Sequence, residues 1–347
     1  MKGRQFCLAA GTAACAVALL LAFADSRAAL AGWLTGFAFW SGLPIGALGL
    51  LMMMRLIPGP WRQELSYPAE CTLVLLPFAA VAALPILLGL GALYPWVAEA
   101  SSGYRAVYLS PAFFVLRTVA FFACLTAFAL LLVVRPAWSG PVSAGGLIVY
   151  VLLATTIAVD WLMSRDPAFH SSGFGLYTLT NQMIIALSVL LVVRLTSGHP
   201  PDRPGVLGGL LLCALLFWAY FAFMQYFIIW SNNLPPSVAW YRQRGDGVWS
   251  AAEYAIAILQ LAPAFLLFFP PIRNGIRWLL ALSVAVLAGK MLEMVWLVMP
   301  TVQDHEAVGA IAALASLLGL GLLTKVVFGV APLVLVRLER REARLPS

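Results

Sequence analysis

The fold class follows from one stretch, residues 111–134, which reads PAFFVLRTVAFFACLTAFALLLVV. Arg117 is the only charged residue in it. An α-helix rises 1.5 Å per residue and the hydrocarbon core of a bilayer is about 30 Å thick, so a stretch of this length crosses a membrane. It therefore predicts a transmembrane helix with one ionisable group inside.

Similar stretches recur along the whole chain of 347 residues, of which 63% are apolar and 10% are charged. Soluble domains carry about 25% charged residues, so this composition excludes a water-soluble protein. We predict an all-α integral membrane protein that forms a single polytopic domain, residues 1–347, with about ten transmembrane helices. Their expected ranges are roughly 5–24, 31–56, 71–93, 111–134, 143–163, 174–195, 204–232, 249–270, 275–299 and 307–335.

The basic residues predict the orientation, because cytoplasmic loops are enriched in Lys and Arg. One side would hold Lys2, Arg4, Arg55, Arg62, Arg135, Arg194, Arg203, Arg273, Arg277, Arg337, Arg340, Arg341 and Arg344; the other would hold Arg27, Arg105, Arg165, Arg242 and Arg244. We expect the first side, with both termini, to face the cytoplasm. The net charge of +7 then reflects topology rather than a nucleic-acid partner. The first stretch also imitates a secretory signal, whose cleavage would leave nine helices in the same orientation.

Ionisable and amide side chains inside the helices are the candidate functional residues, because each is costly in hydrocarbon. The predicted topology places six of them in the outer half of the bilayer, together with Asn181 and Gln182: Arg117, Asp160, Gln225, Glu253, Lys290 and Glu293. Lys290 and Glu293 are three residues apart, so they share a helical face and are expected to pair. The set is compatible with structural ion pairs, with a proton relay, or with a site for a small ligand or quinone.

Other polar residues have simpler interpretations. Lys325, near the inner end of the last helix, can extend its side chain to the interface. Glu64, Tyr67, Glu70 and Thr72 precede or begin the third stretch, where they form either a solvated surface or a cytoplasmic proton entrance.

The chain offers no pattern typical of a redox centre. His170, His199 and His305 fall in predicted loops, and the five cysteines form no C-x-x-C motif. Neither haem nor an iron–sulfur cluster nor a disulfide framework is expected in this chain, and no catalytic centre is apparent.

Tryptophan and tyrosine gather near the outer helix ends, as in an interfacial belt. The loop at residues 230–249 is richer than an anchor requires, because it also contains two prolines with Arg242 and Arg244. It is expected either to dock an extramembrane subunit or to seal the bundle.

Several strings in matching order resemble the ActF-type membrane subunit of alternative complex III, a quinol:cytochrome c oxidoreductase with NrfD/PsrC-like membrane subunits. They are MRLIPGPW (54–61), LYPW (93–96), PAFFVLR (111–117), VDWLMSRDPAFHSSGFGLY (159–177), WAYFAFMQYFIIWSNNLPPSVAWYRQR (218–244) and KMLEMVWLVMP (290–300). The resemblance covers about residues 50–300. One departure is that Leu259 and Gln260 stand in the turn before Pro263, where the family often has a histidine.

The resemblance implies two four-helix bundles with flanking helices, in the cytoplasmic membrane of a bacterium. It implies a subunit that binds no cofactor of its own and that contacts membrane lipid, a related quinol-binding membrane subunit, and iron–sulfur and cytochrome c subunits. Quinol, iron–sulfur clusters and haem c would belong to those partners. The family residues that carry over are Arg117, Asp160, Gln225, Lys290 and Glu293.

The leading hypothesis is a structural and proton-translocating subunit, in which neutralising Glu293 or Asp160 reduces proton translocation. Two alternatives are a secondary transporter, suggested by buried polar residues and by Pro85 and Pro263 within helices, and a quinone-binding subunit of another oxidoreductase. Subunits that co-purify with the protein would separate these.

Overall fold

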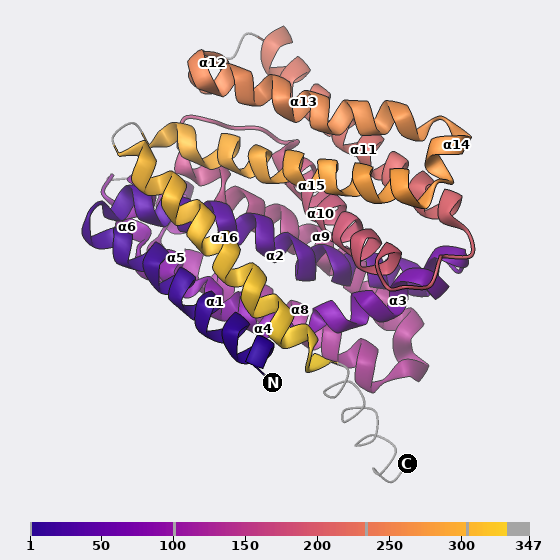
Figure 1. The fold of residues 1–347 in the computed structure, drawn as a ribbon. Helices are drawn as coiled ribbons and strands as arrows, with labels where there is room; N and C mark the ends of the chain where they lie inside the picture. The colour runs from indigo at the N-terminus through magenta and orange to yellow at the C-terminus, as the bar shows by residue number, and fades with distance from the viewer. Residues whose placement is uncertain (1, 100–101, 233–234, 303–304, 332–347) are drawn as a thin grey trace.

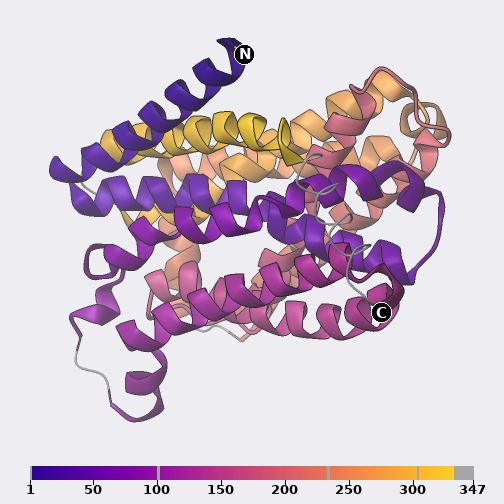
Figure 2. The same ribbon diagram turned by 90° about the horizontal axis from the view of Figure 1, so that it is seen from below.

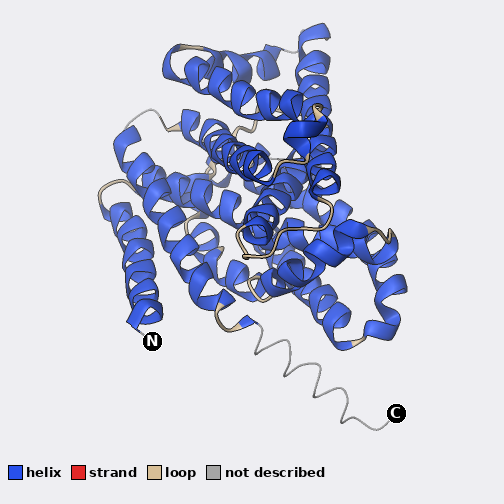
Figure 3. Cartoon of the chain, turned by 45° about the vertical axis from the view of Figure 1, so that its right-hand side comes forward, coloured by secondary structure: helices blue, strands red, loops and turns tan. Residues whose placement is uncertain are grey.

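The computed structural model describes residues 2–99, 102–232, 235–302 and 305–331, and they form an all-α integral membrane protein (Figures 1 and 3). Nine of the described helices are long and apolar enough to cross a membrane, and a bent pair brings the number of spans to ten. The straight spans are α1 (Lys2–Leu20), α2 (Ser26–Leu56), α8 (Pro111–Val134), α9 (Ser139–Trp161), α10 (Phe174–Leu195), α11 (Pro204–Ser231), α13 (Gly247–Leu267), α15 (Ile276–Val298) and α16 (Glu306–Phe328). The predicted fold class is confirmed.

The third span is the bent one. It begins with α3 (Pro60–Leu73), which continues at an angle of 44° into α4 (Leu76–Ala82) and α5 (Leu84–Leu88), and it ends with α6 (Leu90–Leu93). Pro77 and Pro85 stand at the starts of α4 and α5, where the missing N–H groups interrupt the helical hydrogen bonds. The predicted range of 71–93 therefore covered only the second part of this span.

Short helices complete the connections. They are α7 (Gly103–Tyr108), α12 (Pro235–Gly245) and α14 (Pro270–Arg273), with 3-10 turns at η1 (Leu21–Phe23), η2 (Pro95–Val97), η3 (Pro136–Trp138), η4 (Met163–Arg165) and η5 (Met299–Thr301). The stretch predicted as an outer loop at 230–249 thus contains a helix. Connections alternate between two ends of the bundle, which we call the α12 end and the α14 end (Figure 1).

The spans form two groups of four. One contains α2, the bent third span, α8 and α9; the other contains α10, α11, α13 and α15. The two groups also pack on each other, because α2 contacts α10 and α15 and α9 contacts α10. Helices α1 and α16 lie together along the outer side of α2 (Figure 2). The last predicted span, 307–335, extends beyond α16, and residues 332–335 lie outside the described part of the chain.

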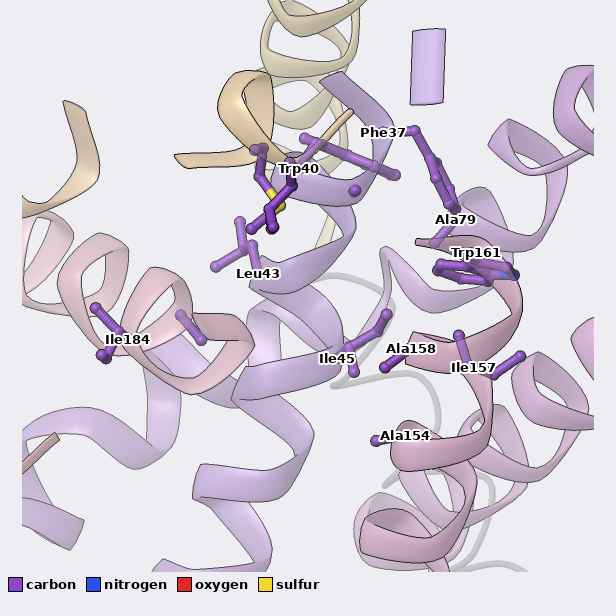
Figure 4. Close-up of a cluster of buried hydrophobic side chains, with 14 of the residues drawn as sticks. Phe37, Trp40, Leu43, Ile45, Ala79, Ala154, Ile157, Ala158, Trp161 and Ile184 are labelled. Carbon is purple, nitrogen blue, oxygen red and sulfur yellow. The ribbon is translucent and has the colours of Figure 1, made fainter. Parts of the chain in front are cut away.

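Helix α2 is the most enclosed of the nine straight spans, and 83% of the residues in its apolar 18-residue stretch are buried. Phe37 packs against Trp161 of α9 with a ring-centroid distance of 5.1 Å, in the core between α2 and α9 (Figure 4). A Cβ added at Gly46 would lie 2.2 Å from the carbonyl oxygen of Gln182 on α10. Glycine is therefore required here for the close contact between the two groups.

Asp25 caps the first turn of α2. Its carboxylate accepts a 2.8 Å hydrogen bond from the Ala28 N–H and contacts Nδ1 of His305 at 3.0 Å. The Ala28 N–H is the main cause of a lowered pKa for Asp25. The cap therefore stabilises the fold at neutral pH, and this contribution is lost as pH falls through the lowered pKa, below about pH 4.

Replacing Asp25 with alanine is expected to lower the free energy of unfolding by about 1 kcal/mol, as for other N-cap substitutions. Denaturant unfolding in mixed micelles at pH 7 measures the difference. Ser26→Ala is the matched control, because Ser26 is exposed and lies next to the cap. Equal stability of the two variants at pH 7 would contradict a capping role.

Candidate functional site

The second group of helices encloses an ion pair, Lys290 and Glu293 on α15. The Lys290 Nζ lies 2.8 Å from Glu293 Oε2, and the two residues are 0% and 1% exposed. Their spacing of three residues places them on one face of the helix. The pairing predicted from the sequence is confirmed.

Two neighbouring helices supply the remaining partners of the pair. From α10, the Tyr177 hydroxyl donates to Glu293 Oε1, and the Asn181 Nδ2 donates to the same oxygen at 3.2 Å. From α11, the Trp218 Nε1 donates to the same oxygen at 2.8 Å. Lys290 donates to Asn181 Oδ1 at 2.7 Å, and its Nζ lies 4.0 Å from the centre of the Trp218 ring.

These contacts explain how two charges persist inside an apolar bundle. A buried ion is tolerated when it is paired and when its remaining hydrogen-bonding positions are satisfied. Here both carboxylate oxygens accept hydrogen bonds, and the ammonium group has two acceptors and an aromatic face. The Lys290–Glu293 cluster, defined as these two residues with Tyr177, Asn181 and Trp218, is therefore neutral overall and well hydrogen-bonded.

Gln260 of α13 lies beside this cluster. It is 0% exposed and donates to the Val286 carbonyl oxygen at 3.0 Å. A Cβ added at Gly289 would lie 2.2 Å from the Gln260 Nε2, so the glycine next to Lys290 makes room for the amide. The position where the resembling family often has a histidine thus carries a buried amide.

A pocket of about 180 Å³ opens on the α12 side of the cluster. Glu293 lines it from α15, and Glu253 lines it from α13. Gln225 of α11 also faces it and donates to the Tyr241 hydroxyl at 3.1 Å. Tyr241 lies on α12, where burial raises its pKa to about 12, so it remains a neutral hydroxyl at physiological pH.

Arg117 and Asp160 form a second buried pair, between α8 and α9. The guanidinium binds the carboxylate in a bidentate manner, Nε to Oδ2 at 2.6 Å and Nη2 to Oδ1 at 2.9 Å. It also stacks on Tyr108 and Phe113, with its Cζ 4.1 Å and 4.4 Å from their ring centres. Burial and the negative charge of Asp160 raise the pKa of Tyr108 to about 12.

The sequence placed these residues in one polar layer, and the structure divides them between two groups. No hydrogen bond or ion pair between described residues joins the Arg117–Asp160 pair to the Lys290–Glu293 cluster. Between them lies a cavity of about 10 Å³, lined by Thr178, Asn181 and Gln182. The Thr178 hydroxyl and the Gln182 Oε1 are buried without a partner there, so the cavity suits a single water molecule.

Two buried arginines hold the end of α15, and the sequence did not predict them as structural residues. Arg244 of α12 is 1% exposed and donates to the carbonyl oxygens of Trp296 at 3.2 Å and Leu297 at 3.1 Å. Arg165 donates to the Val298 carbonyl oxygen at 3.3 Å. Cations are favourable at a helix C-terminus, where carbonyl groups lack partners within the helix. Arg244 is therefore bound within the bundle, while Arg242 of the same segment is exposed.

Near the α14 end, the acidic residues of the bent span are also paired. Glu64 accepts from Arg194 at 2.6 Å, and Glu70 contacts Arg55 at 2.5 Å. A pocket of about 470 Å³ beside Glu64 has largely apolar walls from α3 and α10, with Tyr67 and Thr72 among them. Lys325 is exposed near this end of α16, as its interpretation as an interfacial residue requires.

Tyr177 and Trp218 complete the Lys290–Glu293 cluster, although the sequence did not predict them as members of the candidate site. Aromatic residues are common in membrane helices, so neither residue stood out from its surroundings in the sequence. Each stands within one of the strings that carry the family resemblance, Tyr177 at the end of 159–177 and Trp218 at the start of 218–244. That shared position was the available signal.

Comparison with known proteins does not assign the chain to a family. No protein-family model matches the sequence, and no curated protein matches it.

Proposed function

We propose that this protein is a non-redox membrane subunit of a respiratory quinol:cytochrome c oxidoreductase resembling alternative complex III, and that it transfers protons through the Lys290–Glu293 cluster. The observation that carries the proposal is the fully buried, hydrogen-bonded Lys–Glu pair beside a pocket with a second carboxyl group. The family named in this proposal is supported by the ordered sequence strings.

The chemistry of the pair suits proton transfer. Moving one proton from the Lys290 ammonium to the Glu293 carboxylate turns two charges into two neutral groups without changing the net charge. Both residue types can be neutral inside proteins, so each can hold or release a proton. The Arg117–Asp160 pair lacks this freedom because a guanidinium does not lose its proton. We therefore assign Asp160 to anchoring α8 against α9 rather than to transfer.

The orientation is part of the proposal. Arg55, Arg62, Arg194 and Arg203 lie at the α14 end, which accordingly faces the cytoplasm of a bacterium. The basic residues 337–344 lie outside the described part of the chain. The partners would be a related quinol-binding subunit and subunits carrying iron–sulfur clusters and haem c, so electron transfer would take place outside this chain.

The test replaces Glu293 with glutamine in the assembled complex. Glutamine keeps the side-chain oxygen that accepts from Tyr177 and Trp218 but cannot carry the proton. Loss of a positioned acid or base commonly slows a step about 10²–10⁴-fold, so translocation should fall to background while quinol oxidation continues. Protons released per electron, measured in proteoliposomes, report this.

Leu292→Met is the matched control, because Leu292 is a partly buried neighbour on the same helix. An unchanged proton-to-electron ratio in a folded Glu293→Gln complex would reduce the cluster to a structural ion pair.

A secondary transporter is the second candidate, and the bent third span favours it. Carriers often bind substrates at discontinuous helices, and the bend at Val74 and Leu75 lies in the span that lines the 470 Å³ pocket. Purification in mild detergent separates the two functions. Stable association with iron–sulfur and cytochrome c subunits excludes a stand-alone carrier, and isolation as a single chain excludes the complex subunit.

A further inference from the structure

The pocket between α11, α13 and α15 contains a carboxyl group that the buried ion pairs do not neutralise. Glu253 stands six residues after Gly247, the first residue of α13, which is about 9 Å along the helix axis at 1.5 Å per residue. Its side chain is exposed, and among the described residues no Lys, Arg or His forms an ion pair with it. Asp160 and Glu293 each have such a partner.

The surroundings of Glu253 are those of a membrane-facing position. The adjacent face of α13, about 100° around the helix from Glu253, presents large exposed apolar side chains, namely Tyr254, Ile258, Leu261 and Phe265. Glu253 lies at the border between this apolar face and the pocket. An ionised carboxylate without a partner is costly beside hydrocarbon, so the protonated acid is the favoured form there.

The pocket connects this acid to the buried pair. Its volume of about 180 Å³ accommodates about six water molecules at roughly 30 Å³ each. Gln225 and Tyr241 provide polar groups for such water, while aromatic rings form most of the remaining wall: Tyr177, Trp218, Tyr226 and Trp296. A water chain in this space would have Glu253 and Glu293 as its two carboxyl ends.

We propose that Glu253 is a protonated carboxyl group that exchanges its proton with Glu293 through water in this pocket. The inference deepens the proposed function and rests on it for the direction of proton movement, but the protonated state of Glu253 does not depend on that function. In the transfer, the O–H bond of Glu253 breaks, the proton moves along the water, and an O–H bond forms on Glu293. The net charge of these groups is zero before and after the transfer, counted over Lys290, Glu253 and Glu293.

The first test uses dicyclohexylcarbodiimide, an apolar reagent that modifies protonated carboxyl groups within membranes. The purified full-length protein in lipid nanodiscs is treated with it and the modified residue is identified by mass spectrometry. We expect the adduct at Glu253, with Asp160 unmodified. Above the titration midpoint of Glu253, labelling should fall about tenfold per pH unit because only the neutral acid reacts.

Two variants give this test its controls. Glu253→Gln should abolish the adduct without exposing a new site. Arg117→Met removes the partner of Asp160 and should allow labelling there, which shows that the reagent reaches that depth. If Asp160 is labelled in the natural sequence, or if Glu253 shows no pH-dependent adduct, the assignment of Glu253 as the protonated carboxyl group is overturned.

The second test separates this inference from the proposed function by comparing Glu253→Gln with Glu293→Gln in the assembled complex. Loss of proton translocation in both variants supports the water link. Loss in Glu293→Gln alone overturns the link and leaves the proposed function intact. Normal translocation in both overturns the proposed function, whatever the labelling result.

Discussion

Replacing Lys290 with methionine should destabilise the protein by about 1–3 kcal/mol at pH 7, because the Glu293 carboxyl group can take up a proton and the remaining cost is that of unsatisfied hydrogen bonds. Methionine has a similar length but leaves the Glu293 carboxylate without a cation at 1% exposure. Asn181 also loses the donor that its Oδ1 accepts at 2.7 Å. Denaturant unfolding in mixed micelles measures the loss, with Leu292→Met as the control on the same helix.

The double variant Lys290→Met with Glu293→Gln distinguishes charge from packing. It removes both charges and keeps an oxygen that can accept from Tyr177 and Trp218. Part of the stability lost in Lys290→Met should return, because glutamine is neutral without having to take up a proton. A double variant as unstable as the single one would show that the pair matters through packing alone.

The Arg117–Asp160 pair should respond asymmetrically to the loss of either partner. Asp160→Leu leaves a guanidinium that cannot become neutral, so it should cost about 3–5 kcal/mol. Arg117→Met leaves a carboxyl group that can take up a proton, so its cost should approach that of unsatisfied hydrogen bonds, about 1–3 kcal/mol. The free energy of unfolding of each variant, measured at pH 7, gives the comparison.

Leu116→Met is the control for these variants, because Leu116 is 59% exposed on the same helix. Equal costs for the two substitutions at pH 7 would contradict the view that protonation relieves Asp160. Lowering the pH should stabilise Arg117→Met relative to Asp160→Leu, since acid favours the neutral carboxyl group.

The sequence predicted the membrane fold because span length and low charge are local properties of each stretch. The bend in the third span was less accessible. Prolines 68, 77 and 85 were visible, yet proline is common in membrane helices, where neighbouring groups compensate for the missing hydrogen bond. Hydropathy located the part around 71–93, whereas the helix itself begins at Pro60 and is held to α10 by the Glu64–Arg194 pair.

The candidate site was predictable only where its residues share a helix. Lys290 and Glu293 follow from a spacing of three residues. Tyr177 and Trp218 come from two other helices, and no periodicity in a single sequence states how those helices rotate relative to α15. The same reason hid Arg244, whose buried contacts with the α15 carbonyl groups depend on where α12 folds back.

The close contact at Gly46 has a consequence for how anything could cross this protein. Carriers that alternate access move one half of the bundle against the other. Here the backbones of α2 and α10 meet so closely that a single added Cβ would lie 2.2 Å from the Gln182 carbonyl oxygen. Such a contact resists sliding and rocking of the two halves. This rigid junction permits transport that needs no large movement. Transfer of single protons along side chains and ordered water is transport of that kind.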